Sequence, residues 1–280
     1  MDIIVADPSG ACYGVERARN MALEALGDDA GKGNVHTFGP LIHNPIVVAD
    51  LEARGARVVR DISEMEEGTL VVRSHGITRG QYEEAQRRGL RIVNATCPHV
   101  RRVQQSAAQL AAEGRFVVIV GEKGHPEVEG ILSHAGEHAA IVLEANEIPE
   151  LGEGARVGVV VQTTQSPEKL AEIVDGLGER GYDVEVHDTI CAATRKRQEA
   201  ARGLAAQADV MVVIGGRNSG NTRRLAEICS EACPRTHHIE TSGELEASWF
   251  AGARTVGVTA GASTPQAHVD AVVKALEEIA

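Results

Sequence analysis

The chain has 280 residues, 43% of them hydrophobic but only 2% aromatic, so it can form two or three domains with aliphatic cores. Its formal net charge of −12 excludes broad binding to the phosphate backbone of nucleic acid, although a small anionic ligand needs only a local patch. No apolar run reaches the length of about eighteen residues typical of a membrane span, and residues 1–5 lack the features of a signal peptide, so we expect a cytoplasmic protein.

Short runs of aliphatic and β-branched residues alternate with helical patterns along the whole chain. In chain order, we expect strands at Ile3–Val5, Val35–Phe38, Arg57–Val59, Leu70–Val72, Arg91–Val93, Phe116–Val120, Ala140–Leu143, Val157–Val161, Val184–Val186, Val210–Ile214, His237–Ile239 and Val256–Val258. We expect helices at Val15–Leu26, Ile46–Arg54, Gly80–Arg88, His99–Ala112, Pro167–Arg180, Thr194–Gln207, Asn221–Glu231 and Pro265–Ile279. Continuously apolar strands that alternate with helices are typical of parallel sheets covered on both faces. The sequence therefore predicts an α/β fold.

Three cysteines divide the chain into near thirds, and each follows an apolar run and precedes a helical stretch. They are Cys12, Cys97 and Cys191. The twelve expected strands give four strands to each third, provided that the first strand completes the last unit. We therefore predict αβα units with mainly parallel four-stranded sheets at residues 14–97, at 98–191 and, as a discontinuous third unit, at 1–13 with 192–280.

The placement of these three cysteines indicates a metal centre. A single free cysteine is most often a small buried hydrophobe, but strand ends that converge would bring three soft thiolates together. A cubane iron–sulfur cluster needs four ligands, so three cysteines would leave one iron open for substrate. Zinc held by three cysteines and a histidine is the competing interpretation. The odd total of five cysteines does not indicate a disulfide framework, and we expect Cys229 and Cys233 to pack in the core or at a helix end.

Polar residues follow many of the expected strands, and ligands of open parallel sheets bind beyond the carboxyl ends of the strands. His43, His75 and His125 each come just after such an end. A lone histidine is more often structural, but several histidines together with backbone N–H groups can hold a diphosphate. The segments 218–221 and 263–265 each open a helix, and helix N-termini favour anions.

Helix capping is the alternative role for the hydroxyl residues in these segments. For Ser166 and Thr264 we expect plain capping. For Ser219 and Ser263 capping and ligand binding are compatible.

Glu127 is the carboxylate that we expect to move protons. It follows His125 by two residues, and a carboxyl group near a bound anion has a raised pKa, which suits a general acid near neutral pH. The alternative is a first-turn helix glutamate favoured by the helix dipole, which is our expectation for Glu129.

Together these segments resemble the 4-hydroxy-3-methylbut-2-enyl diphosphate reductase family, of the LytB type, which acts in the methylerythritol phosphate route to isoprenoids. The resemblance covers essentially the whole chain. Its motifs are Gly10-Ala11-Cys12-Tyr13-Gly14-Val15-Glu16-Arg17-Ala18, Gly39-Pro40-Leu41-Ile42-His43-Asn44, Arg73-Ser74-His75-Gly76, Ala95-Thr96-Cys97-Pro98, Gly124-His125-Pro126-Glu127-Val128-Glu129-Gly130, Gln162-Thr163-Thr164, Cys191-Ala192-Ala193-Thr194-Arg195-Lys196-Arg197-Gln198, Asn218-Ser219-Gly220-Asn221-Thr222 and Thr259-Ala260-Gly261-Ala262-Ser263. Each motif alone is weak, but their order and spacing together are specific.

The resemblance implies three αβα units in a pseudo-threefold arrangement around one central [4Fe–4S] cluster. It assigns Cys12, Cys97 and Cys191 to the cluster. It assigns Glu127 to proton delivery, with His125 assisting and Thr163 near the substrate hydroxyl; Thr164 is adjacent and stays open. It places around the substrate diphosphate His43, His75, His125, Ser219, Gly220 through its backbone N–H, Asn221 and Ser263.

The implied reaction removes an allylic hydroxyl with two electrons and two protons, giving isopentenyl and dimethylallyl diphosphate and water. It implies an electron donor of ferredoxin or flavodoxin type as partner, and neither nucleic acid nor membrane. Three residues depart from the family pattern: Gly220, where the pattern has a second serine, Asn94, where it has aspartate, and Tyr13. Two alternatives stay open from the residues: a non-redox dehydratase, and a non-catalytic iron–sulfur sensor or zinc-stabilised binding protein.

Overall fold

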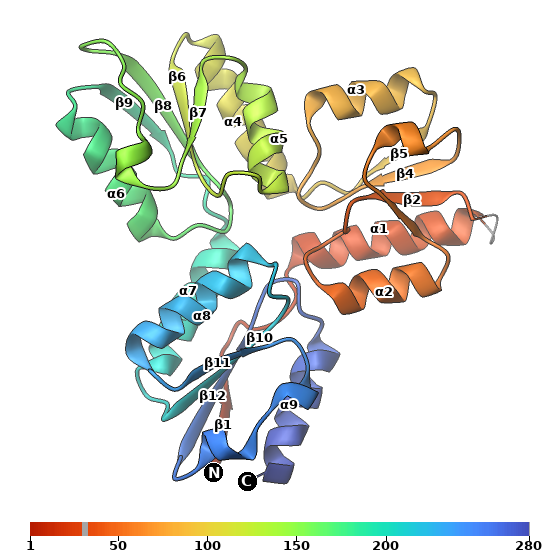
Figure 1. The fold of residues 1–280 in the computed structure, drawn as a ribbon, viewed down its shortest axis with the longest axis vertical. Coiled ribbons are helices and arrows are strands. Elements are labelled where there is room, and N and C mark those ends of the chain that lie inside the picture. Colours follow the sequence, from red (N-terminus) through yellow and green to blue (C-terminus); the bar gives the residue numbers. More distant parts are fainter. Residues whose placement is uncertain (30–32, 280) are drawn as a thin grey trace. The chain divides into compact units, whose positions relative to one another are not determined.

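The computed structural model describes residues 1–29 and 33–279, and these form three parallel sheets of four strands each, interleaved with helices (Figure 1). The twelve strands expected from the sequence are all present, and the predicted α/β fold is confirmed. The helices are α1 (Tyr13–Asp29), α2 (Pro45–Ala53), α3 (Arg79–Arg87), α4 (Pro98–Ala112), α5 (Pro126–Ala135), α6 (Pro167–Glu179), α7 (Ala192–Ala205), α8 (Gly220–Ala232) and α9 (Gln266–Ile279). Within the described ranges, no helix combines the length and apolar content that crossing a membrane requires.

The first sheet in chain order has the strand order β3-β2-β4-β5, and the second has the order β7-β6-β8-β9. Their strands are β2 (Val35–Phe38), β3 (Arg57–Val59), β4 (Thr69–Val72), β5 (Arg91–Asn94), β6 (Phe116–Val120), β7 (Ala139–Val142), β8 (Arg156–Val161) and β9 (Asp183–His187). Every pairing is parallel, which fits strands that follow one another through helical connections.

The third sheet joins the two ends of the chain. Its order is β1-β12-β10-β11, with β1 (Asp2–Val5), β10 (Val210–Ile214), β11 (Thr236–Ile239) and β12 (Thr255–Ala260). Strand β1 pairs in parallel with β12, so that Asp2 lies opposite Thr255. The first strand therefore completes the last sheet, as the strand count predicts.

Alternate residues of the central strands pack against helices on opposite faces of the sheet. In β6, Val118 and Val120 join the core formed with α6, whereas Val117 and Ile119 join the core formed with α4 and α5. This period of two is what a strand buried on both faces requires. Each fully buried aliphatic side chain contributes roughly 2 kcal/mol of burial free energy.

The contacts of the backbone divide the chain into two compact units. The first unit contains Met1–Val15, His43–Ile46 and Ala192–Ala280 and holds the sheet of β1. The second unit contains Glu16–Ile42 and Val47–Cys191 and holds the other two sheets. The finer division at 14–97, 98–191 and 1–13 with 192–280 stays a prediction, and residues 30–32 and 280 of those ranges lie outside the described part of the chain.

Candidate functional site

The three cysteines singled out in the sequence lie where strands give way to helices. Cys97 follows β5 and is the N-cap residue of α4, Cys191 directly precedes α7, and Cys12 directly precedes α1. Each backbone N–H donates to a neighbouring loop: Cys97 to the carbonyl of Ser74 (2.9 Å), Cys191 to that of Thr163 (3.0 Å) and Cys12 to that of Ala262 (3.0 Å). All three are partly exposed, and none of them forms a disulfide.

The remaining two cysteines have a different environment. Cys229 and Cys233 are buried and pack with α7, α8 and β10. Burial, with a smaller contribution from Cys233, raises the pKa of the Cys229 thiol to about 12. A metal ligand must be a thiolate, so Cys229 is a core residue, as the sequence predicts. The donor set of Cys12, Cys97 and Cys191, accessible soft thiols without disulfide partners, fits an iron–sulfur cluster with three protein ligands.

In the second unit, Glu127 and Thr163 form a buried hydrogen-bonded pair. Glu127 lies in the first turn of α5 and Thr163 follows β8, and their exposed fractions are 1% and 6%. The backbone N–H of Thr163 donates to Oε1 of Glu127 (2.7 Å), and the Thr163 hydroxyl donates to Oε2 (2.9 Å). Burial raises the pKa of Glu127 to about 7, although the two bonds from Thr163 oppose the shift. The carboxyl group therefore exchanges a proton near neutral pH.

This raised pKa predicts a loss of stability as the pH rises. The Glu127 carboxyl ionises near 4.5 in the unfolded chain and near 7 in the folded one, so the folded state binds the extra proton between these values. We expect the free energy of unfolding of the apo protein to fall by roughly 3 kcal/mol more for wild type than for Glu127→Gln over this pH range. Urea unfolding of both proteins at several pH values measures this difference, and parallel pH profiles would contradict it.

His125 supports this pair from the start of the same helix. Its side chain caps α5, because Nδ1 accepts a hydrogen bond from the backbone N–H of Glu127 (3.1 Å). The neutral ring then carries its proton on Nε2, which makes Nε2–H a donor. The ring of His75, from the loop after β4, packs edge-on against that of His125 with centroids 5.5 Å apart. The structure thus brings two of the three predicted histidines together within the second unit.

The two adjacent threonines after β8 have separate partners. The hydroxyl of Thr164 accepts a bond from Nε2 of Gln162 (3.2 Å), and Oε1 of Gln162 accepts from the backbone N–H of Glu122 (3.0 Å). The hydroxyl of Thr163 instead donates to Glu127. Gln162 is fully buried and braces this turn, a role that its place in the sequence motif did not indicate.

In the first unit, the start of α8 offers polar groups to a ligand. Ser219 is its N-cap and accepts a bond from the backbone N–H of Thr222 (3.3 Å). Asn221 is only 4% exposed, yet neither Nδ2 nor Oδ1 of its amide has a hydrogen-bond partner among the described residues. A buried amide without partners costs free energy that a polar ligand would recover. The N-terminus of this thirteen-residue helix also favours an anion.

The segment His43–Ile46 lies against this helix end. The side chain of Asn44 donates to the carbonyl of Ser263 (2.9 Å), and the hydroxyl of Ser263 donates to the carbonyl of His43 (3.3 Å). Gly216 allows the close approach, because a Cβ there would lie 2.5 Å from the carbonyl oxygen of His43. Within the first unit, the structure therefore groups His43 and Ser263 with the loop that leads into Ser219, Gly220 and Asn221.

The capping predictions have mixed outcomes. Ser166 caps α6 by accepting from the backbone N–H of Lys169 (3.2 Å), as expected. The expectation of plain capping is wrong for Thr264: its buried hydroxyl donates to the carbonyl of Ile214 (3.1 Å) and ties this loop to the end of β10. Helix α9 begins only at Gln266, too far along for Thr264 to be a simple cap.

Comparison with known proteins identifies similar sequences and structures. A family profile described as LytB protein matches residues 3–277. Two relatives are 4-hydroxy-3-methylbut-2-enyl diphosphate reductases, from Geotalea uraniireducens (48% identical) and Pelobacter propionicus (47% identical). Each alignment covers all of this chain, and the two cover 98% and 99% of the respective relative.

Two solved structures are also similar. One, of (E)-4-hydroxy-3-methyl-but-2-enyl diphosphate reductase, described as the terminal enzyme of the non-mevalonate pathway, is 43% identical with a TM-score of 0.71, covering 99% of this chain and 100% of that one. The other, the reductase of Plasmodium falciparum, is 27% identical with a TM-score of 0.92, covering 98% of this chain and 87% of that one.

Proposed function

Because the chain belongs to the LytB family, we propose that it is a 4-hydroxy-3-methylbut-2-enyl diphosphate reductase. In this reaction the allylic C–O bond breaks, the oxygen leaves as water, and a C–H bond forms. Two electrons and two protons enter for each substrate molecule, so the products are isopentenyl or dimethylallyl diphosphate and water. We place the protein in the cytoplasm and expect neither nucleic acid nor membrane as a partner.

The observation that carries this proposal is the buried pair of Glu127 and Thr163. A carboxyl group with a pKa of about 7 is half protonated at neutral pH, and the hydroxyl of Thr163 is bonded directly to its Oε2. When Glu127 is protonated, the direction of this bond reverses, and the Thr163 hydroxyl then donates to the next acceptor. A substrate hydroxyl at that point receives the proton that lets it leave as water.

For the cofactor, we propose a [4Fe–4S] cluster, one per chain, held by Cys12, Cys97 and Cys191. Such a cluster supplies electrons one at a time and, with three protein ligands, an open iron that polarises an oxygen. The chain's own contribution is to fix the three thiolates at loop-to-helix junctions and to hold the acid Glu127 in a buried site.

For the diphosphate, we propose the donors at the start of α8: the hydroxyl of Ser219, the N–H of Gly220 and the side chain of Asn221. His43 and Ser263 lie against the same loop, and His75 and His125 are further donors assigned by the resemblance. Hydrogen bonds to an anion are the strong, charge-assisted kind. The unpartnered buried amide of Asn221 supports this assignment.

An anaerobic assay on the reconstituted protein tests the proposal. With a reduced viologen dye in place of the ferredoxin or flavodoxin partner, we expect 4-hydroxy-3-methylbut-2-enyl diphosphate to oxidise the dye and yield both five-carbon diphosphates. Turnover without any electron donor would instead establish a dehydratase. Binding of zinc rather than iron, with no dye oxidation, would establish the non-catalytic alternative.

A further inference from the structure

An arginine follows each of the three proposed cluster cysteines within the first two turns of the next helix. These are Arg17 in α1, Arg102 in α4 and Arg197 in α7, five or six residues after Cys12, Cys97 and Cys191. The recurrence of arginine at nearly the same distance from each cysteine indicates a shared task near the cysteine loops.

Arg197 holds the backbone just ahead of Cys12, within the first unit. Its side chain is buried, with 4% of the residue exposed. Nε and Nη2 donate to the carbonyl of Gly10 (3.2 and 2.8 Å), Nη2 also reaches the carbonyl of Ala11 (3.4 Å), and Nη1 donates to the carbonyl of Ala193 (3.0 Å). The planar guanidinium thus joins the first turn of α7 to the loop of Cys12.

The same loop is held from its other side by backbone hydrogen bonds. Gly10 donates to Ala260 (3.4 Å) and Cys12 donates to Ala262 (3.0 Å). Gly10 has a φ of +79°, and a Cβ there would lie 3.3 Å from the carbonyl of Thr264, so the residue can hardly be other than glycine. The N–H groups of Gly10 and Cys12 therefore bond to Ala260 and Ala262, whereas the carbonyls of Gly10 and Ala11 accept bonds from Arg197.

Arg17 repeats this arrangement in the second unit, at the loop of Cys97. Its Nη1 donates to the carbonyls of Thr96 (3.2 Å) and Ala95 (3.5 Å), while the N–H of Cys97 donates to Ser74 (2.9 Å). Each of these two cysteine loops is thus fixed by an arginine that follows a different cysteine in the sequence. Arg102, the third, lines one groove together with Asp188 and Thr189, which lead into Cys191.

We propose that Arg197 and Arg17 are positioning residues that orient the Cys12 and Cys97 thiolates for the cluster and place permanent positive charge beside their loops. The inference rests on the proposed function, because it needs the cluster. A guanidinium remains charged at all physiological pH values, and a nearby positive charge favours the reduced, more negative cluster. Its planar fork also holds two carbonyls in a fixed relative geometry, whereas a lysine ammonium is a single point charge on a flexible stem.

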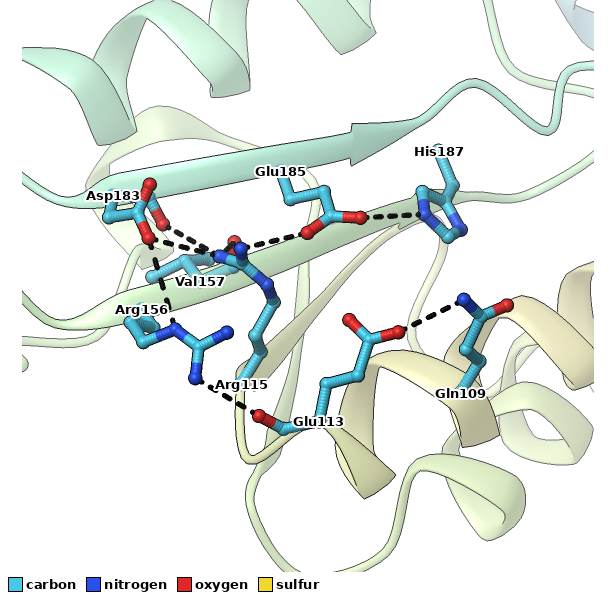
Figure 2. A network of polar contacts seen from close by, with 8 residues as sticks. All are labelled: Gln109, Glu113, Arg115, Arg156, Val157, Asp183, Glu185 and His187. Atoms are coloured by element: carbon cyan, nitrogen blue, oxygen red, sulfur yellow. Dashed lines mark hydrogen bonds and ion pairs between the residues drawn. The ribbon is translucent and has the colours of Figure 1, made fainter.

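The test compares Arg197→Lys and Arg197→Gln with a matched arginine far from the cysteines. Arg115 directly precedes β6, at the amino end of that strand, and its guanidinium reaches Asp183 and Glu185 of β9 (Figure 2). Its side chain is only 11% exposed. It donates to the carbonyls of Val157 (3.4 Å) and Asp183 (3.3 Å) and pairs with Glu185 (2.8 Å). Arg115→Lys therefore removes a similar buried fork without touching a cysteine loop.

We expect all three variants to unfold at lower temperature than wild type in the apo state. In the reconstituted proteins, Arg197→Lys should lose its iron–sulfur absorption to a chelator at least tenfold faster than Arg115→Lys. Arg197→Gln should in addition shift the midpoint potential of the cluster to a more negative value. Arg17→Gln, at a half-buried residue, should show the same two effects and replaces the Arg197 variants if these do not fold.

Two results would overturn the inference. If the Arg197 and Arg17 variants lose the cluster no faster than Arg115→Lys and keep the wild-type potential, these arginines serve the fold alone. If wild type itself takes up no iron–sulfur cluster, both the inference and the proposed function fall, and the absence of a wild-type spectrum separates this outcome from the first.

Discussion

Replacing any one of Cys12, Cys97 and Cys191 by serine is expected to abolish the iron–sulfur absorption of the reconstituted protein and to reduce turnover to background. Serine keeps the size of the side chain but offers a hard hydroxyl in place of a soft thiolate. With only two thiolates left, a cubane cluster lacks the ligands to persist, so the iron content should drop from about four per chain to below one. Iron and sulfide analysis, with the visible spectrum, measures the effect.

The buried cysteines provide the control. Cys229→Ala removes a sulfur whose raised pKa keeps it protonated, and the small cavity should cost roughly 1 kcal/mol of stability. Its iron content and turnover should match wild type. Loss of iron in Cys229→Ala, or full iron content in any of the three serine variants, would contradict the assignment of the ligands.

Local sequence patterns predict much of the fold. The strands are apolar runs bounded by turn residues, and the assignment of β1 to the last sheet needed only a strand count, which the pairing of Asp2 with Thr255 confirms. Helix α5 is absent from the helices expected from the sequence. Its ten residues include Gly130 in the middle and β-branched neighbours, which weaken a helical pattern. It forms because Val128 and Ile131 are buried against the core of α4, a tertiary effect.

A short capped 3₁₀ helix follows one edge strand of each sheet. After the edge strands β3, β7 and β11, the chain forms the short 3₁₀ helices η1 (Ile62–Glu64), η2 (Ala145–Glu147) and η3 (Ser242–Glu244). Each has a capping box that ends in glutamate, from Asp61, Glu144 and Thr241 respectively. The boxes of Asp61 and Thr241 match the sequence pattern of a capping residue with glutamate three positions later, whereas Glu144 is not a usual capping residue, so the structure is needed to find the second box. The recurrence of this capped helix, once per sheet, marks the three sheets as structurally equivalent.

The sequence predicts which residue types form the candidate site, but not which of them contact one another. Polar residues beyond strand ends indicate where ligands bind; this pattern made the histidines and Glu127 candidates, whereas Thr163 became one through the family resemblance. The choice between Thr163 and Thr164 stayed open, because both follow the same strand. The structure separates them: Thr163 bonds to Glu127, whereas Thr164 bonds to Gln162. Adjacent residues leaving a strand face opposite ways, but the side that faces Glu127 depends on the packing of α5.

Glu127→Gln is expected to lower turnover by about 10² to 10⁴-fold, the usual contribution of a positioned acid. Glutamine has the same shape, and its Oε1 can still accept the bond from the backbone N–H of Thr163. Its amide cannot release a proton, so the relay through Thr163 ends. The cluster spectrum and the affinity for the diphosphate substrate should stay close to wild type, because the variant removes neither a thiolate nor an anion donor.

The pH dependence identifies Glu127 as the group that titrates. With a pKa of about 7, the wild-type rate should fall as the pH rises through 7, because the carboxyl group loses the proton that it must deliver. The residual rate of Glu127→Gln should lack this fall. Glu129→Gln is the control, since Glu129 lies one half-turn further along α5 and accepts from the backbone N–H of Gly124 (3.0 Å). If Glu127→Gln and Glu129→Gln turn over at the same rate, Glu127 takes no part in the mechanism. Protonation of the leaving oxygen would then fall to His125, whose Nε2–H is the next donor in the same turn.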